Sequence, residues 1–154
     1  MSFRIKGLAA EPFLDLFALD DEALAARGMR RVVADAPRSA PCRVTLEDAA
    51  PGEALILLPY THQTAHSPYH ASGPIYVRET ARETFDAVGA LPPVFEGRLL
   101  SVRAYDAEGL MPAADCAQSD PRPLFERFFA DPEVAYLHVH YANRGCYSCR
   151  VDRA

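Results

Sequence analysis

Apolar and polar residues alternate along several short segments, a pattern typical of strands with one buried face. The clearest case is Arg98–Asp106, in which every second residue is small or apolar. A continuous apolar run in Glu53–Tyr60 predicts a strand that is covered on both faces. Further strands are predicted over residues 3–8, 29–34, 75–78, 110–116, 134–141 and 146–151.

Helical spacing of apolar residues is confined to a few short segments. A helix is predicted from Asp120 to about Ala130, with its large apolar side chains on one face. A shorter helix, Glu22–Arg27, follows an aspartate cap and ends before Gly28, and helical turns are expected over residues 13–17 and 80–88. Because strands outnumber helices, we predict an α+β fold with a mostly antiparallel or mixed sheet and a few short helices packed on it.

Length and charge narrow the class of protein. A chain of 154 residues predicts a single domain over residues 1–154. The net charge of -5 and the lack of a basic run argue against a nucleic-acid partner. Without a leader or a long apolar run, we expect a cytoplasmic protein with no membrane partner and reduced cysteines. A small molecule is the expected partner, and the sequence leaves the oligomeric state open.

The predicted C-terminal hairpin carries the first group of candidate residues. His138 and His140 are two positions apart on one strand, so both imidazoles leave the same face. A three-residue loop places Cys146 on that face, whereas a four-residue loop places Cys149 there. In a regular strand their odd spacing separates the two cysteines, which argues against a redox Cys-x-x-Cys pair.

Three interpretations of the hairpin stay open. His138 and His140, joined by one cysteine, have the donor types of a zinc or iron site. Alternatively, His140 and Cys146 are catalytic, with the imidazole acting as the base that activates the thiol. The simplest interpretation is that the histidines line a half-buried sheet face and hydrogen bond to their neighbours.

A second group of candidates lies in residues 61–74, which are expected to form a loop between strands. His62, His66 and His70 are spaced by four, as in some helical metal sites. Pro68 disfavours a helix before His70, so exposed imidazoles in a loop are the preferred interpretation.

Arg103 lies in the middle of a predicted strand, and Arg43 and Arg78 pose the same question. A covered guanidinium needs either a carboxylate or a bound anion. The carboxylates of residues 47, 48 and 53 are the expected structural partners. The alternative is a small anionic ligand on Arg103, with further ligand-binding candidates Tyr60, His62, Tyr69 and Asn143.

Eight short stretches carry a family resemblance as an ordered set. They are Pro41–Arg43, Leu46–Ala49, Gly52–Glu53, Leu58–Tyr60, Ser67–Tyr69, Ser72–Ile75, Arg103–Asp106, and His140–Asn143 with Gly145 and Cys146. Together they resemble the bacterial domain-of-unknown-function family 1203 over about residues 41–153. The resemblance implies a bacterial cytoplasmic protein of one domain, and it transfers no reaction, cofactor or catalytic residue.

Two functions therefore compete at the level of the sequence. The first is a metal-dependent or enzyme-like small-ligand pocket that uses His140 and Cys146. The second is a non-catalytic module that binds a small anion through Arg103. A structural or interaction protein without a site is a third class, which no sequence feature favours or opposes.

Overall fold

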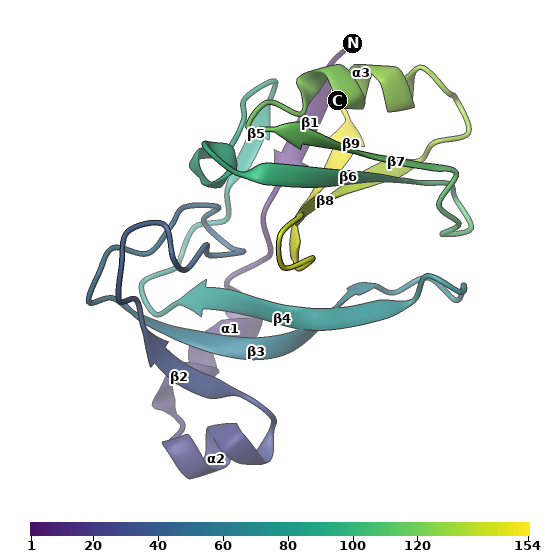
Figure 1. Ribbon diagram of the computed structural model, residues 1–154. Coiled ribbons are helices and arrows are strands. Elements are labelled where there is room, and N and C mark those ends of the chain that lie inside the picture. Colours follow the sequence, from purple (N-terminus) through teal and green to yellow (C-terminus); the bar gives the residue numbers. More distant parts are fainter.

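Nine strands form two antiparallel sheets in the computed structural model, which describes all 154 residues. The larger sheet has the order β5-β1-β9-β8-β6-β7, and the smaller has the order β2-β3-β4 (Figure 1). The strands are β1 (Phe3–Lys6), β2 (Arg30–Val33), β3 (Ala54–Gln63), β4 (Ala71–Arg78), β5 (Asp86–Val88), β6 (Leu99–Tyr105), β7 (Ala113–Gln118), β8 (Tyr136–Tyr141) and β9 (Tyr147–Arg153).

The helices are short and lie on the outer sides of the two sheets (Figure 1). They are α1 (Glu11–Leu14), α2 (Asp21–Ala26) and α3 (Arg122–Phe129), with 3-10 turns at Asp15–Ala18 and Pro93–Phe95. The aspartate at position 20 caps α2 by accepting a hydrogen bond from the backbone N–H of Ala23, as its sequence predicts. The N- and C-termini lie near each other beside α3, where the N–H of Ala154 donates to the carbonyl of Ser2.

Each sheet buries its own apolar cluster. The helix α3 covers the larger sheet, where Phe125 packs against Phe3 with their ring centroids 5.2 Å apart. The smaller sheet buries Ile56, Ile75 and Val77 against α1 and α2. A polar and aromatic layer lies between the two sheets, where His62 of β3 meets His138, His140 and Tyr147 of the larger sheet, and this layer positions the candidate site.

The antiparallel sheet architecture is confirmed, but the balance of elements differs from the expected α+β class. The molecule is closer to a mostly-β protein, because the helix predicted over residues 80–88 is absent. Residues Asp86–Val88 instead form β5, which pairs with β1 along the edge of the larger sheet. Tertiary pairing with β1 thus overrides the local helical spacing.

The loop predicted over residues 61–74 is also shorter than expected. Strand β3 continues to Gln63 and β4 begins at Ala71, so the connection spans only residues 64–70. Two polar side chains of this stretch, those of His62 and Gln63, are compatible with a strand because they contact His140 and Tyr136 of the larger sheet. No helix of the structure is both long and apolar enough to cross a membrane.

Candidate functional site

Three histidines that are distant in sequence meet between the two sheets. His62 comes from β3, and His138 and His140 come from β8. The His62 ring centroid lies 5.0 Å from that of His140 and 6.2 Å from that of His138, and the two β8 rings are 6.3 Å apart. We call these three residues the histidine cluster. Four tyrosines surround it: Tyr60, Tyr105, Tyr136 and Tyr147.

Two β-bulges shape the histidine cluster, one from each sheet. His62 lies at an irregularity of the β3–β4 ladder, between the paired residues Thr61 and Gln63. In the β8–β9 ladder, Ser148 is the extra residue, because Val139 pairs with Cys149 while His140 pairs with Tyr147. Bulges re-aim side chains, and here they direct an imidazole from one sheet and a tyrosine ring from the other into the same layer.

Because of the β8–β9 bulge, the two cysteines do not lie where the sequence predicts. The carbonyl of Cys146 accepts a hydrogen bond from the N–H of Tyr141, so the hairpin starts in the register of a four-residue loop. Beyond the bulge, His138 pairs with Arg150, which is the register of a three-residue loop. Neither cysteine therefore faces the histidines. Both cysteines instead pack against the apolar cluster under α3.

His140 and Cys146 accordingly do not form the predicted nucleophile–base pair. His140 Nδ1 lies 2.9 Å from the carbonyl oxygen of Gly145, and no hydrogen bond joins its ring to the Cys146 thiol. Cys149 is fully buried, and burial raises the pKa of its thiol to about 12. A thiol with so high a pKa is not an activated nucleophile.

The histidine cluster is neutral at physiological pH. Burial, together with the charges of the neighbouring histidines and of Arg150 and Arg103, lowers the pKa of His138 to about 3. Burial lowers the pKa of His140 to about 3 as well, although the hydrogen bond to Gly145 opposes the shift. Burial and the positive charge of Arg103 also lower the pKa of His62. The imidazoles thus present uncharged nitrogens to the layer between the sheets.

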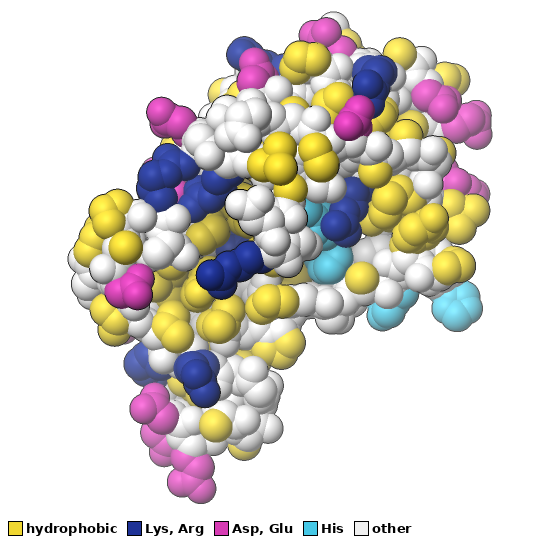
Figure 2. All heavy atoms as spheres, viewed as in Figure 1, with side chains coloured by type: hydrophobic (Ala, Val, Ile, Leu, Met, Phe, Trp, Pro, Cys, Tyr) yellow, Lys and Arg dark blue, Asp and Glu magenta, His cyan; other side chains and the backbone are white.

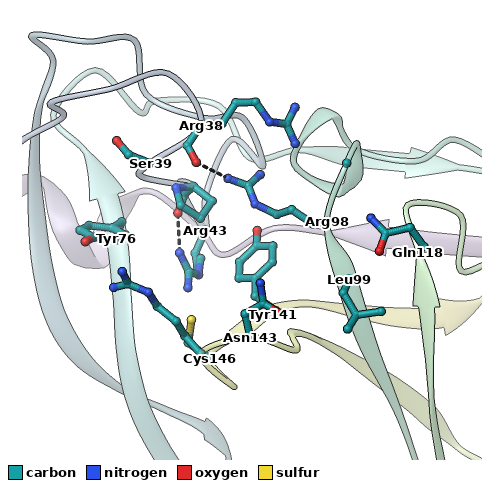
Figure 3. A pocket seen from close by; sticks show the side chains of 13 residues that line it. Arg38, Ser39, Arg43, Tyr76, Arg98, Leu99, Gln118, Tyr141, Asn143 and Cys146 are labelled. Atoms are coloured by element: carbon teal, nitrogen blue, oxygen red, sulfur yellow. Dashed lines mark hydrogen bonds between the residues drawn. The ribbon is translucent and has the colours of Figure 1, made fainter.

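A pocket of about 570 Å³ opens beside this layer and is lined by four arginines: Arg38, Arg43, Arg98 and Arg144. We call it the arginine pocket. Figure 3 shows the Tyr141 ring and the Cys146 thiol within it, below the guanidinium of Arg98. Figure 2 shows basic side chains gathered around a hollow of the surface, with histidine side chains further along the same side of the molecule. The pocket therefore combines positive charge with an aromatic wall.

Arg43 forms the base of the arginine pocket and is only 1% exposed. Its Nε donates to the carbonyl of Tyr147 at 2.7 Å, and its Nη1 donates to the carbonyl of Pro41 (Figure 3). The guanidinium also lies 5.0 Å from the centre of the Tyr141 ring. No carboxylate pairs with it, although a buried cation ordinarily requires a counter-charge.

Arg98 has a structural role at the rim of the same pocket. It makes a two-point contact with Asp48, at 2.7 and 2.8 Å, and donates to the carbonyls of Val94 and Arg38. The backbone of Arg38 has a φ of 58°, a conformation that costs a non-glycine residue about 1 kcal/mol or more. The hydrogen bond from Arg98 thus helps hold Arg38 at the pocket opening (Figure 3).

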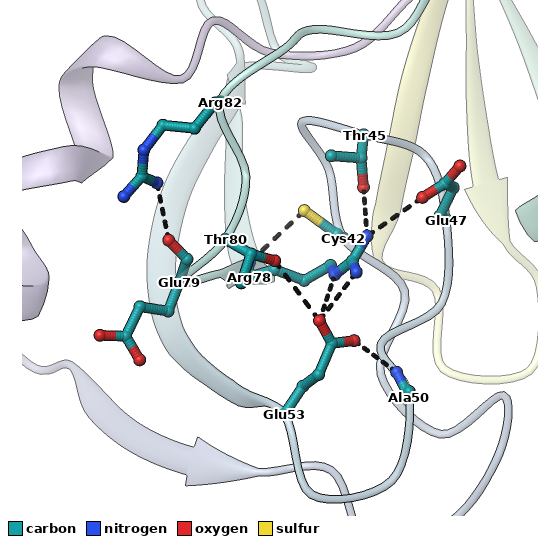
Figure 4. A network of polar contacts seen from close by, with 9 residues as sticks. All are labelled: Cys42, Thr45, Glu47, Ala50, Glu53, Arg78, Glu79, Thr80 and Arg82. Carbon is teal, nitrogen blue, oxygen red and sulfur yellow. Dashed lines mark hydrogen bonds and ion pairs between the residues drawn. The ribbon is translucent and has the colours of Figure 1, made fainter.

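The carboxylates that were expected to pair with Arg103 pair with other arginines. Glu47 and Glu53 bind Arg78 in the network of Figure 4, and the third carboxylate binds Arg98. Arg103 lies in the layer between the sheets next to His138, its partner in the β6–β8 ladder, and forms no ion pair. Its charge is therefore available to a ligand.

The comparison with protein families agrees with the ordered motifs of the sequence. A family model described as "Protein of unknown function (DUF1203)" matches residues 39–153. The chain belongs to this family. The DUF1203 region contains the whole histidine cluster and every lining residue of the arginine pocket except Arg38. No curated protein and no solved structure matches the chain, so no relative indicates a reaction or a ligand.

The remaining predicted site residues of the DUF1203 chain are divided between the two sites. Tyr60 borders the histidine cluster through Tyr147, with ring centroids 6.1 Å apart, and Tyr69 contacts Tyr105 at the edge of the same layer. Asn143 instead lines the arginine pocket. The other two histidines of the predicted loop, His66 and His70, are exposed and separate from the histidine cluster.

Sequence reasoning missed the arginine pocket as a unit. Its arginines come from three separate parts of the chain, and of the four only Arg43 was singled out, as a guanidinium that needs a carboxylate or a bound anion when covered. As the side chains stand, no group of three or more His, Cys, Asp or Glu residues already has the geometry of a metal site. The arginine pocket itself offers arginine and tyrosine side chains that face a solvent-accessible hollow.

Proposed function

We propose that this DUF1203 protein binds a small anionic molecule in the arginine pocket. The observation that carries the proposal is the buried Arg43, whose guanidinium has backbone carbonyls and an aromatic ring as partners but no carboxylate. An anion bound in the pocket would supply the missing counter-charge. This is the second of the two functions inferred from the sequence, a non-catalytic anion-binding module, with its centre moved from Arg103 to Arg43.

The charge balance of the pocket supports an anionic ligand. Arg98 is neutralised by Asp48, whereas Arg38, Arg43 and Arg144 form no ion pair with any carboxylate. Three uncompensated cations around one hollow raise the local concentration of anions even though the whole chain is acidic. A ligand with two or more negative charges would balance this excess best.

The side-chain types narrow the ligand class further. Arginine presents a planar fork of donors that matches carboxylate and phosphate groups in two-point contacts. Tyr76 and Tyr141 add aromatic surface, and Gln118 and Asn143 add amides that can hydrogen bond to either donors or acceptors. A volume of about 570 Å³ lies within the range of small-molecule sites. A carboxylated or phosphorylated metabolite-sized compound fits these features.

Binding can be tested by thermal shift and titration calorimetry with phosphate, sulfate and citrate, each at the same ionic strength as a chloride reference. Arg38→Gln and Arg144→Gln remove pocket charges at exposed positions, so the protein should stay folded. We expect each to weaken binding about tenfold, the typical effect of losing a charge-assisted hydrogen bond. Arg43→Lys keeps the charge but loses the fork, and should weaken binding as well.

Two control variants separate this pocket from other sites. Arg127→Gln removes a cation that pairs with Asp115 on the surface of α3, and should leave anion binding unchanged. Arg103→Gln tests the alternative centre beside the histidine cluster. If citrate or phosphate stabilises the wild type no more than chloride does, or if only Arg103→Gln abolishes the effect, the proposal for the arginine pocket is wrong.

A further inference from the structure

We propose a second site, independent of the arginine pocket: a divalent transition-metal ion, with zinc as the reference ion, bound by His62, His138 and His140. The ion would lie between the two sheets and join them. The inference rests on the hydrogen-bond state of the three rings, on their spacing, and on the two bulges that bring them together.

Each ring of the histidine cluster has a buried nitrogen without a hydrogen-bond partner. These atoms are Nδ1 of His62, Nδ1 of His138 and Nε2 of His140, and the cluster accounts for every such side-chain atom in the structure. The whole residues His138 and His140 are 3% and 0% exposed. A buried polar atom without a partner costs about 1–3 kcal/mol, so three such atoms in one place indicate a missing binding partner.

The tautomer of His140 identifies what kind of partner is missing. The carbonyl oxygen of Gly145 can only accept, so Nδ1 of His140 must carry the proton of the bond between them. The neutral ring then presents a bare lone pair at Nε2. Metal-binding histidines are usually held in this way: one ring nitrogen donates to a carbonyl or carboxylate, and the other faces the metal.

The spacing of the rings is close to that of three imidazoles around one ion. With Zn–N bonds of about 2.0–2.1 Å, imidazole centroids in a tetrahedral site lie about 5 Å apart. The observed separations are 5.0, 6.2 and 6.3 Å, so the cluster is slightly more open than a closed site. This opening agrees with the finding that no three donors already have metal-binding geometry.

The 6.3 Å separation of the two β8 rings can shorten only if the His138 ring turns, which its Nδ1, free of hydrogen bonds, allows. The other separations can shorten through His62. It is half-buried and lies at the bulge of β3, outside the regular pairing with β4, so its ring can turn without breaking a ladder hydrogen bond. His138 and His140 are held by the β6–β8 and β8–β9 ladders. Metal binding would therefore draw the smaller sheet toward the larger one through a single side chain.

Arg103 determines what completes the coordination. Its positive charge acts on all three histidines and opposes a bare cation there. The same charge favours an anion as the fourth ligand, such as a carboxylate or hydroxide that contacts both the metal and the guanidinium. Imidazole donors with an open fourth position suit zinc, cobalt, nickel or copper better than magnesium or calcium.

The experiment uses untagged full-length protein, stripped with a chelator and titrated with Co²⁺ and then Zn²⁺. We expect one Co²⁺ per chain with the visible absorption of a tetrahedral site, displacement of that signal by Zn²⁺, and a rise in melting temperature. His62→Gln should weaken Co²⁺ binding by more than about 100-fold, because losing a ligand costs more than losing an outer-shell partner. His140→Gln should have the same effect if it folds.

His66→Gln and His70→Gln are matched controls, because both residues are exposed and lie just beyond His62 in the chain. They should bind Co²⁺ like the wild type. The half-buried His62 keeps the test decisive even if the fully buried His140 variant unfolds. Absence of a tetrahedral Co²⁺ signal, or a signal that survives in His62→Gln, would overturn the metal site and leave the arginine pocket untouched.

Discussion

The buried Arg43 and the half-buried Arg78 and Arg98 differ in how their charges are balanced. Arg78 and Arg98 each bind a carboxylate at 2.7–2.8 Å, whereas Arg43 depends on two carbonyls and the Tyr141 ring. A paired arginine has a structural role, because a carboxylate of the protein already balances its charge. An unpaired one keeps its charge for a ligand, and this distinction separates Arg43 from the other two.

The Arg78 network gives a prediction for a single residue. Glu53 accepts hydrogen bonds from Arg78 and from the N–H of Ala50 (Figure 4). Burial opposes ionisation of Glu53, but these bonds outweigh it and hold its pKa below the usual value. Glu53→Gln leaves Arg78 with only the exposed Glu47 as its counter-charge, so we expect the free energy of unfolding to fall by about 1–3 kcal/mol.

Urea denaturation at pH 7 measures this change. Glu79→Gln is the control, since Glu79 is exposed and its carboxylate has no partner in the network. An equal loss of stability in both variants would show that the Glu53–Arg78 pair has no special role.

Sequence reasoning identified the chemistry-bearing residue types but not their partners. The three carboxylates were expected as structural partners of Arg103, but Glu47 and Glu53 pair with Arg78, and Asp48 pairs with Arg98. The partners depend on how loop residues 38–53 fold over β4 and β6, and local patterns contain no information on that path. His62 and His138 were likewise placed in separate groups, because their separation in sequence hides their contact in space.

At the level of elements, strand patterns were more informative than loop patterns. The alternation in β6, the apolar face of α3 and the hairpin of β8 and β9 all appear in the structure where the sequence predicts them. The bulges at His62 and Ser148 were not predicted, because a bulge changes pairing without changing local composition. A one-residue shift reverses which face a strand residue occupies, so without the bulge each of the two predicted registers put one cysteine, Cys146 or Cys149, on the histidine face.

Gly7 provides a prediction at the element scale. It follows β1 where the chain leaves the larger sheet, and the N–H of Leu8 beside it donates to the carbonyl of Arg43. A methyl group on Gly7 would overlap the backbone carbonyl of Val44. We expect Gly7→Ala to lower the free energy of unfolding by about 3 kcal/mol, because backbone atoms on both sides must move apart.

Gly73→Ala is the matched comparison for this substitution. Gly73 lies in β4, where an added methyl group meets nothing within 4 Å. Its free energy of unfolding should stay the same or rise by up to about 1 kcal/mol, since alanine restricts the unfolded chain. Similar effects of the two substitutions in chemical denaturation would argue against close packing at Gly7.

For the whole molecule, the layer between the two sheets is the feature that links fold to function. It is built from histidine, tyrosine and arginine rather than from aliphatic side chains, and it meets the arginine pocket at Tyr147. The ring of Tyr147 stacks on His62 at a centroid distance of 5.4 Å, and its carbonyl accepts from Arg43. Through this residue the position of the smaller sheet affects both candidate sites.

Neutral histidines in this layer predict that metal-free protein loses stability in mild acid. The folded-state pKa values of His138 and His140 are about 3, against an ordinary value of 6.5. Between these limits the unfolded chain binds protons that the folded chain excludes. Unfolding therefore becomes easier as pH falls below about 6.5, by up to about 1.4 kcal/mol per pH unit for each histidine.

Denaturation with urea between pH 7 and 5, in the presence of a chelator, tests this dependence, because few carboxylates titrate in that range. Protonation there would place new charge beside Arg103, Arg150 and the His62 ring, so the smaller sheet should detach first. His138→Gln removes one titrating group and should flatten the profile, whereas His66→Gln should keep the wild-type slope. A profile that is flat in the wild type, or equally steep in His138→Gln, would mean that the layer accommodates protonated imidazoles and does not join the two sheets in the way its geometry indicates.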